Sequence, residues 1–477
     1  MHEDLRRRAL ESGKTVSNKA KSKGSSRNSS KANSAPNSRA ASRVQSRDVS
    51  DDEDTGNGNL SDETTQSINS IDQLLESDDF NEQTTENLRH DLSTAISELL
   101  DRKGSSSESR QTNLTTYCRC LTYHYLAEGL YGQVEGLLTA FSRSIKAETN
   151  ETETGLALRA VALTAITYSA SSLYEMVAPL LKRTISDSQS LPTKATAIYT
   201  LGICLTFGGA GEDEIMDMMT FLLEIVQSDG SFISADDNVD VVAAALHTYG
   251  FLATQVEDVE HESEDAVAAF LDQLDADDVR VQIAAGENIA LLYEKSYTER
   301  EEDDSDSSED DFEDGDGDND QSSDERDDSG LVKRYNAYHN THEVLEKTQA
   351  LASLSTKNLN RRDKKILHQS FATIAVTIEN PKRGLQSNNA SKMVVRIHHE
   401  GEMRVDKWWK FMRLHAIRRL LGGGFVNHYF EGNKQVLDAL PLIMRATGAE
   451  GVRSPRKAAG ANKSSKGKYR NDRRFVS

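Results

Sequence analysis

Apolar residues between positions 66 and 297 recur at the spacing of one face of a helix. The segments from Leu158 to Ala165, from Ile198 to Leu205 and from Val239 to Leu246 all place them at positions i, i+3, i+4 and i+7. This stretch contains two prolines and no run of the alternating pattern that is typical of strands. The pattern therefore predicts that residues 66–297 form one helix after another.

The helical segments also repeat. Similar sequences start at residues 155, 191, 238 and 277, and each is followed by a second apolar segment, as at 173–185. Pairs of helices at a spacing of roughly 40 residues are typical of armadillo and HEAT-type solenoids, in which each pair buries its apolar face against its neighbours. We therefore predict an all-α helical-repeat solenoid, with an irregular helical bundle as the alternative.

The remaining chain divides by composition. Residues 331–380 continue the helical pattern, and residues 381–450 form a small basic C-terminal domain in which a short hairpin is expected around Glu400 and Gly401. Three segments hold too few apolar residues to offset the entropy of ordering them, so we expect them to be disordered. These segments are a basic, Ser-rich arm at 1–65, an acidic insertion at 298–330 and a basic tail at 451–477.

Charge is sorted along the chain into three blocks of opposite sign. Residues 1–50 carry a net charge of +8, residues 51–330 carry −47 and residues 331–477 carry +18, although the whole chain is acidic at −21. A local excess of Lys and Arg attracts polyanions whatever the net charge of the chain. The two basic ends are therefore candidates for binding nucleic acid, and the acidic block could cover the basic one within the same molecule.

The acidic insertion offers phosphorylation sites rather than a metal site. Ser307 and Ser308 each have an acidic residue three positions later, which suits an acid-directed kinase, and Ser454 precedes a proline in the basic tail. Asp314, Asp316 and nearby acids partly match a calcium-binding loop, but Asn319 stands where that loop needs glycine. The sequence therefore predicts no metal site here.

Other features bear on location and chemistry. No stretch approaches 18 apolar residues, and three cysteines without a disulfide framework fit a reducing compartment, so we expect an intracellular protein with no membrane partner, located in the cytoplasm, the nucleus or both. No G-x-S-x-G, H-E-x-x-H, phosphate-loop or kinase motif occurs. We therefore expect no enzyme, no cofactor and no small-molecule substrate.

The densest local signal lies between residues 404 and 430, where cations alternate with aromatic residues. Cations bind phosphates, and planar rings stack on unpaired bases, so this mixture is typical of RNA binding. The candidates for phosphate contacts are Arg404, Lys407, Lys410, Arg413, Arg418 and Arg419, and those for stacking are Trp408, Trp409 and Tyr429. The alternative is that both tryptophans and Phe411 are core residues of a helix at 407–421 that caps the solenoid.

These residues also carry a resemblance to a known family. The segment RLHAIRRLLGGGFVNHYFEGNKQVLDAL, preceded by DKWWKF, resembles the C-terminal signature of the interferon-related developmental regulator family. The upstream segment DKKILHQSFATI is similar to the basic segment of that family, although Ile366, Leu367 and Ala372 stand where more polar residues are usual.

The resemblance implies a regulatory function. Members of the family are described as factors that dock on translationally idle ribosomes and as transcriptional co-regulators. We therefore expect a non-enzymatic helical-repeat factor that binds ribosomes or ribosomal RNA through its basic C-terminal domain and keeps ribosomes inactive. The alternative is a nuclear transcriptional co-regulator that acts as an adaptor between regulatory proteins.

Overall fold

The structure is a computed structural model of the 477-residue chain. It describes residues 85–101, 104–168, 170–299, 330–354, 359–384, 393–398 and 401–445. All of these belong to one compact unit, residues 55–477. The segments predicted to be disordered lie outside the described residues, except for positions 298, 299 and 330.

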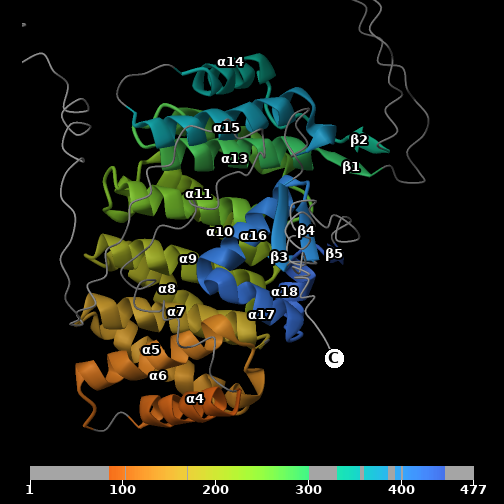
Figure 1. Ribbon diagram of the computed structural model, residues 1–477. Coiled ribbons are helices and arrows are strands. Elements are labelled where there is room, and N and C mark those ends of the chain that lie inside the picture. Colours follow the sequence, from red (N-terminus) through yellow and green to blue (C-terminus); the bar gives the residue numbers. More distant parts are fainter. Residues whose placement is uncertain are drawn as a thin grey trace, which may run out of the picture. The chain divides into compact units, whose positions relative to one another are not determined.

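Paired helices form the solenoid, as the repeated apolar pattern predicts. An inner row of helices stacks in chain order, each contacting the next, and a second helix precedes each of them on the outer side (Figure 1). The inner row comprises α5 (Ser107–Tyr123), α7 (Glu151–Thr167), α9 (Leu191–Phe207), α11 (Val239–Ala253), α13 (Val279–Lys295) and α15 (Arg361–Glu379). The outer helices are α4 (Thr85–Leu100), α6 (Val134–Ala147), α8 (Leu173–Asp187), α10 (Glu212–Gln227), α12 (Glu260–Gln273) and α14 (Thr341–Ala352).

Local sequence fixes where the inner helices begin. Each starts after a residue whose side-chain oxygen accepts a backbone N–H of the first turn and so satisfies a donor that the helix cannot. These N-cap residues are Ser106, Asn150, Ser190, Asn238, Asp278 and Asn360. The inner helices are buried on several sides, because neighbours pack on both flanks, and their many Ala and Gly residues allow this close approach.

One buried cation fixes the end of an outer helix. Lys194 is 1% exposed, and its Nζ donates to the carbonyl oxygens of Ile185, Ser186 and Ile233 at 2.8, 2.8 and 2.6 Å. The first two carbonyls belong to the last turn of α8, where no intrahelical donor is available. Lys194 therefore joins the end of α8 to the short 3-10 turn at Ser231–Ile233.

A pair of short strands closes the base of the acidic insertion. β1 (Tyr297–Glu299) pairs antiparallel with β2 (Leu331–Lys333), and Glu299 lies opposite Leu331. The chain therefore leaves the solenoid after α13 and returns to the same place before α14. The contact between α13 and α15 continues the helical stack across the insertion.

The C-terminal module contains a small sheet and three helices. The predicted hairpin is present as β3 (Met393–His398) and β4 (Gly401–Val405), and β5 (Ile443–Arg445) adds a third antiparallel strand beside β4 that the sequence did not indicate. Between them lie α16 (Trp408–Leu421), α17 (Phe425–Phe430) and α18 (Lys434–Ala439). Short 3-10 turns at Ala127–Leu130, Pro381–Arg383 and Gly422–Gly424 complete the described elements.

Candidate functional site

The C-terminal module lies on the inner row of the solenoid. Helix α16 contacts α5, α7, α11 and α13, while α17 contacts α5 and α18 contacts α7 (Figure 1). Eight of the fourteen residues of α16 are buried, including Phe411, Leu414, Ile417 and Leu421. Contacts on several sides explain why the sequence of this helix shows no single apolar stripe.

A carboxylate of the solenoid holds the start of α16. Lys407 is the N-cap residue, but its side chain makes no capping bond. Instead, the Glu294 carboxylate on α13 accepts the N–H of Trp408 at 3.0 Å and that of Trp409 at 3.3 Å. Burial raises the pKa of Glu294 to about 7, although these two N–H groups and Lys407 favour its charged form.

The two tryptophans occupy different environments. Trp408 is 1% exposed, its indole N–H donates to Thr377 Oγ1 at 2.9 Å, and its ring packs edge-on against Phe411. The assignment of Trp408 as a base-stacking residue is therefore wrong for this fold, because its ring and its one donor are already occupied in the core. Trp409 is half-buried, and Arg413 lies over its ring at 5.0 Å.

Two of the predicted phosphate-binding arginines point into the protein. Arg413 donates to the hydroxyl and the carbonyl of Thr254 at 3.0 and 2.5 Å, and Arg419 lies over the ring of Tyr199 at 4.5 Å. Both side chains therefore join α16 to the solenoid. Both are partly exposed, as Lys407 and Lys410 are, but these contacts occupy their guanidinium groups.

The other predicted residues lie nearer the surface. Arg404 on β4 is exposed, and Lys407 is partly exposed at the start of α16. Lys410 pairs with Asp406 at 2.6 Å, Arg418 lies over Phe425, and the Tyr429 hydroxyl accepts the N–H of Ile443 at 3.1 Å. Arg404, Lys407 and Trp409 thus lie within six residues of sequence, at the end of β4 and the start of α16. Ser307, Ser308 and Ser454 lie outside the described residues.

The triple glycine does more than end a helix. Gly422 has a φ of +53° and ends α16, which agrees with the helix expected at 407–421. Gly424 lies directly against the backbone of Thr122 and Tyr123 at the end of α5, where any Cβ would overlap the Thr122 carbonyl. Gly423 faces open space. Glycine is therefore required at 422 for conformation and at 424 for close approach.

Several polar residues after the glycines attach the module to α5 and α7, and the sequence analysis did not assign them a role. The His428 ring lies 2.9 Å from the Leu121 carbonyl, and Asn433 donates to the Ile166 carbonyl at 3.0 Å. Glu431 contacts the His124 ring at 2.9 Å and accepts the N–H of Tyr125 at 2.6 Å. Much of the GGGFVNHYFEGN signature is therefore a docking sequence for the solenoid.

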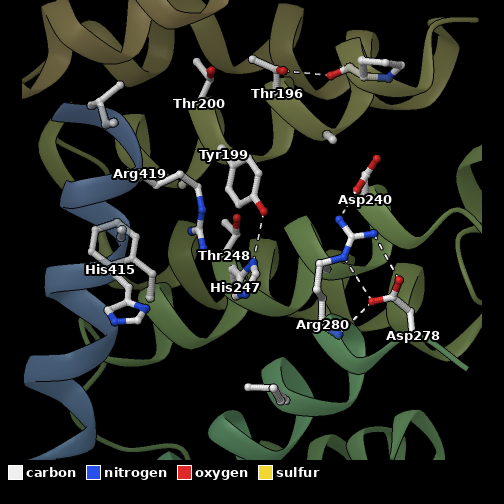
Figure 2. Close-up of a pocket in the computed structure, with 18 of the residues that line it drawn as sticks. Thr196, Tyr199, Thr200, Asp240, His247, Thr248, Asp278, Arg280, His415 and Arg419 are labelled. Atoms are coloured by element: carbon white, nitrogen blue, oxygen red, sulfur yellow. Dashed lines mark hydrogen bonds and ion pairs between the residues drawn. The ribbon is translucent and has the colours of Figure 1, made fainter. Parts of the chain in front are cut away.

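A groove remains open between α16 and the inner helices. Its volume is about 720 Å³, and residues of α7, α9, α11, α13, α15 and α16 line it. Figure 2 shows Arg419 and His415 reaching into it from α16, with Tyr199 bonded to His247 at 3.1 Å. On the opposite side Arg280 pairs with Asp240 at 2.8 Å and with Asp278 at 3.1 Å.

Burial changes the ionisation of groups in this groove. It lowers the pKa of His415 to about 3 and that of His247 well below its usual value, and Arg419 lowers both further, so both rings are neutral at pH 7. Burial also raises the pKa of Glu287 to about 8, although Arg419 acts in the opposite direction. The floor of the groove thus carries a fixed guanidinium and a carboxyl that is mainly protonated at neutral pH.

The two free cysteines of α5 belong to the core. Cys118 and Cys120 are fully buried on α5, and burial raises the pKa of each thiol to about 12. Their Sγ atoms lie near the carbonyl oxygens of Leu156 and Leu88. They pack as small apolar side chains, as expected for buried thiols.

A stack of paired helices with a second module docked on its inner face defines a helical-repeat scaffold, a class whose long surfaces serve to bind other molecules. The chain belongs to the interferon-related developmental regulator family, whose model matches residues 58–379. This range includes the basic segment in α15 and ends before α16. The C-terminal signature, from DKWWKF to NKQVLDAL, therefore lies outside the match.

A fungal relative extends the comparison. The chain is 26% identical over 341 residues to an uncharacterised protein of Schizosaccharomyces pombe (strain 972), and the aligned region covers 71% of each chain. Among the helices that the structure describes, none is long and apolar enough to cross a membrane.

Proposed function

We propose that this protein is a non-enzymatic regulatory factor that binds ribosomes or RNA through its C-terminal module. The observation that supports this proposal best is the sequence of exposed Arg404 and partly exposed Lys407 and Trp409 where β4 leads into α16. It lies in a region, residues 331–477, that holds 29 basic and 11 acidic side chains. Membership of a family of regulators agrees with such a role.

Each member of this group would contact RNA differently. Arg404 and Lys407 would bind phosphates, and Arg418 lies at the other end of α16. Trp409 would stack on an unpaired base with the part of its ring that the protein leaves open. The helix around these residues is already docked, so RNA would meet a preformed surface and would not have to order it.

Ribosome co-sedimentation at low and moderate salt tests the proposal. The variant Arg404→Glu with Lys407→Gln removes two cations of this group. The charge of Lys407 also favours the ionised form of Glu294, so thermal unfolding of the variant checks that the start of α16 stays docked. We expect this variant to sediment less with ribosomes than the wild-type protein. The matched control is Lys182→Glu, a charge reversal at an exposed position on the outer helix α8.

The salt dependence identifies the kind of contact. Each phosphate contact that is lost should lower the slope of log K against log salt by about 1. If the double variant binds ribosomes as the wild-type protein does, the site assignment is wrong. If the wild-type protein does not sediment with ribosomes at all, ribosome binding is wrong. Adding the protein to a cell-free extract and measuring translation would test whether binding keeps ribosomes inactive.

An adaptor between regulatory proteins is the second candidate function. Phe430, Leu442 and Met444 are 62%, 78% and 47% exposed, and the bond between Tyr429 and Ile443 brings their two segments together. Exposed apolar residues that cluster on a surface are typical of protein interfaces. If Leu442→Asp abolishes a protein interaction while ribosome sedimentation is unchanged, the adaptor function is favoured.

A further inference from the structure

Carboxylates line the groove at the N-terminal ends of four of its five inner helices, and α9 contributes none. Glu151, Asp240, Asp278 and Asp363 lie at the N-terminal ends of α7, α11, α13 and α15, so each of four inner helices contributes one. Acidic residues stabilise helix N-termini, and Asp278 also caps α13 and pairs with Arg280. Helix structure therefore explains these four positions without a ligand.

Helix structure does not explain Glu287. This residue lies two turns into α13, where no free helix N–H groups are available. It is 7% exposed and lines the groove, and its carboxyl makes no hydrogen bond or ion pair with any residue that the structure describes. The Glu287 oxygens are not among the fully buried atoms that lack a partner, so they reach the groove, where Arg419 acts on the carboxyl. A ligand in the groove therefore has access to this carboxyl as a hydrogen-bond partner.

The charges around the groove indicate the chemistry of such a ligand. Six carboxyl side chains and three arginines line it. Each arginine is already engaged: Arg159 with the Leu420 carbonyl at 2.7 Å, Arg280 with two aspartates, and Arg419 with the Tyr199 ring. Arg280 offsets Asp240 and Asp278, and the remaining carboxylates Glu151, Asp277 and Asp363 would repel the phosphates of a nucleic acid and attract a cation.

The dimensions of the groove indicate an extended ligand. It crosses five neighbouring inner helices, and packed helices lie about 8–10 Å apart, so it spans roughly 30–40 Å. An extended chain rises about 3.3 Å per residue, so about ten residues would fill this length. A volume of about 720 Å³ holds part of such a segment, so the rest of the segment would lie above the groove.

We propose that this groove binds an extended basic segment of a partner protein, and that a lysine or arginine side chain of the segment pairs with Glu287. The other carboxylates of the groove then face further cations of the same segment. This site is separate from the RNA-binding surface in residues and in charge, so it goes beyond the function proposed above.

Fluorescence polarisation with the full chain tests the proposal. The probe is a labelled ten-residue peptide of alternating lysine and alanine, and the comparison peptide has glutamate in place of lysine. We expect only the lysine peptide to bind. Glu287→Gln keeps the shape and removes the charge, and it should weaken binding about tenfold or more, as expected for loss of a buried charged hydrogen bond.

Two control variants separate this site from others. Glu224→Gln on the outer helix α10 removes an exposed carboxylate away from the groove and should leave peptide binding unchanged. Arg404→Glu should also leave it unchanged, although that variant weakens ribosome binding if the function proposed above is correct. Peptide binding and ribosome binding can therefore fail independently. The thermal unfolding of each variant checks that the fold is retained.

The pH dependence provides a second test of Glu287. A bound cation favours the ionised carboxyl, so the affinity for the lysine peptide should rise from pH 6.5 to pH 8.5 in the wild-type protein and not in Glu287→Gln. Arg419 on α16 is the charged group that acts on Glu287. The other charged groups that line the groove are Glu151, Arg159, Asp240, Asp277, Asp278, Arg280 and Asp363. His247 and His415 stay neutral across this range, because burial and Arg419 lower the pKa of each.

Four outcomes would overturn the proposal. Equal binding of the lysine and glutamate peptides, or no binding, would exclude a site for basic segments. Unchanged affinity in Glu287→Gln would remove the assigned anchor. Binding of spermine but not of the peptide would show a site for small polycations. Peptide binding that appears only after residues 446–477 are removed would show that the chain's own tail is the occupant.

Discussion

The carboxylate of Glu294 accepts the backbone N–H of Trp408 at 3.0 Å, across 114 positions of sequence. Glu294 lies in the last turn of α13, and Trp408 is the first residue of α16. A residue of the solenoid thus performs the capping function that Lys407, the N-cap residue of α16, does not. This contact makes the start of the C-terminal helix dependent on the folded solenoid.

Removing this cap should destabilise the protein. Glu294→Ala leaves two buried N–H groups without an acceptor, and we expect a loss of about 1–3 kcal/mol in the free energy of unfolding. Urea denaturation measures the loss, and hydrogen exchange at Trp408 should become faster. Glu224→Ala, at an exposed position on α10, is the control and should change stability little. An unchanged exchange rate at Trp408 would show that Glu294 is not the cap in solution.

The two adjacent tryptophans should respond to substitution in opposite ways. Trp408→Phe removes a buried indole and its bond to Thr377, so it should lower the free energy of unfolding by about 1–3 kcal/mol. Trp409→Ala should have a smaller effect on stability and should weaken RNA binding, because stacking on a base contributes about 1–3 kcal/mol. Denaturation and RNA-binding titrations of the two variants distinguish a core residue from a contact residue.

The three glycines should differ in their tolerance of alanine. Gly424→Ala forces α17 away from α5, and we expect it to destabilise the protein by about 1–3 kcal/mol or more. Gly423→Ala should be tolerated, because its position is open. Gly422→Ala should fall between them, since only backbone strain at its positive φ opposes it. Equal melting temperatures for the three variants would contradict the docking role of this turn.

The ion pair between Glu153 and Arg110 should make the protein sensitive to acid. Burial alone would raise the pKa of Glu153, but hydrogen bonds from Arg110 at 2.7 Å and from Ser144 and Ser107 at 2.8 Å outweigh it and lower that pKa. A carboxyl with a lowered pKa stabilises the fold above its unfolded pKa of about 4.5 and loses this effect as the pH falls. Glu153→Gln should therefore reduce stability at pH 7 and reduce it less at pH 3, as measured by thermal unfolding.

The buried acids Glu287 and Glu294 should have the opposite effect. Burial raises the pKa of Glu287 to about 8 and that of Glu294 to about 7, so both favour the fold when protonated. Their contribution is full below about pH 4.5 and is lost as the pH rises through these two values. The free energy of unfolding of Glu287→Gln should rise relative to that of the wild-type protein by up to about 1.4 kcal/mol per pH unit between pH 4.5 and 8. Above pH 8 the difference should stay constant. A constant difference across this range would show that Glu287 is ionised throughout.

The sequence predicted the solenoid because its signals are local. Capping residues such as Ser190, Asn238 and Asp278 begin helices whose apolar positions follow within a few residues, and the pattern repeats along the chain. The same kind of signal correctly placed the hairpin and the break after Leu421. Strand β5 was missed, because three residues are too few to show alternation.

The candidate site was harder to predict, because its geometry depends on contacts between distant segments. Trp408 and Trp409 have the same chemistry and differ only by about 100° around the helix, so the pattern could not tell which one faces the core. Arg413 and Arg419 were assigned to phosphates because the partners that turn them inward, Thr254 and Tyr199, lie more than 150 positions away. A row of cations in a sequence therefore does not reveal how many of them reach the surface.

The docking of α16 on both α5 and α13 determines which surface is exposed while the chain is being synthesised. The solenoid helices leave the ribosome first, while the segment that covers their inner face, residues 408–445, lies close to the C-terminus. Until that segment emerges, the apolar surface that later contacts Leu414 and Ile417 faces water. A nascent or prematurely terminated chain would therefore display a surface suited to chaperones and prone to aggregation, which α16, α17 and α18 cover once they have emerged.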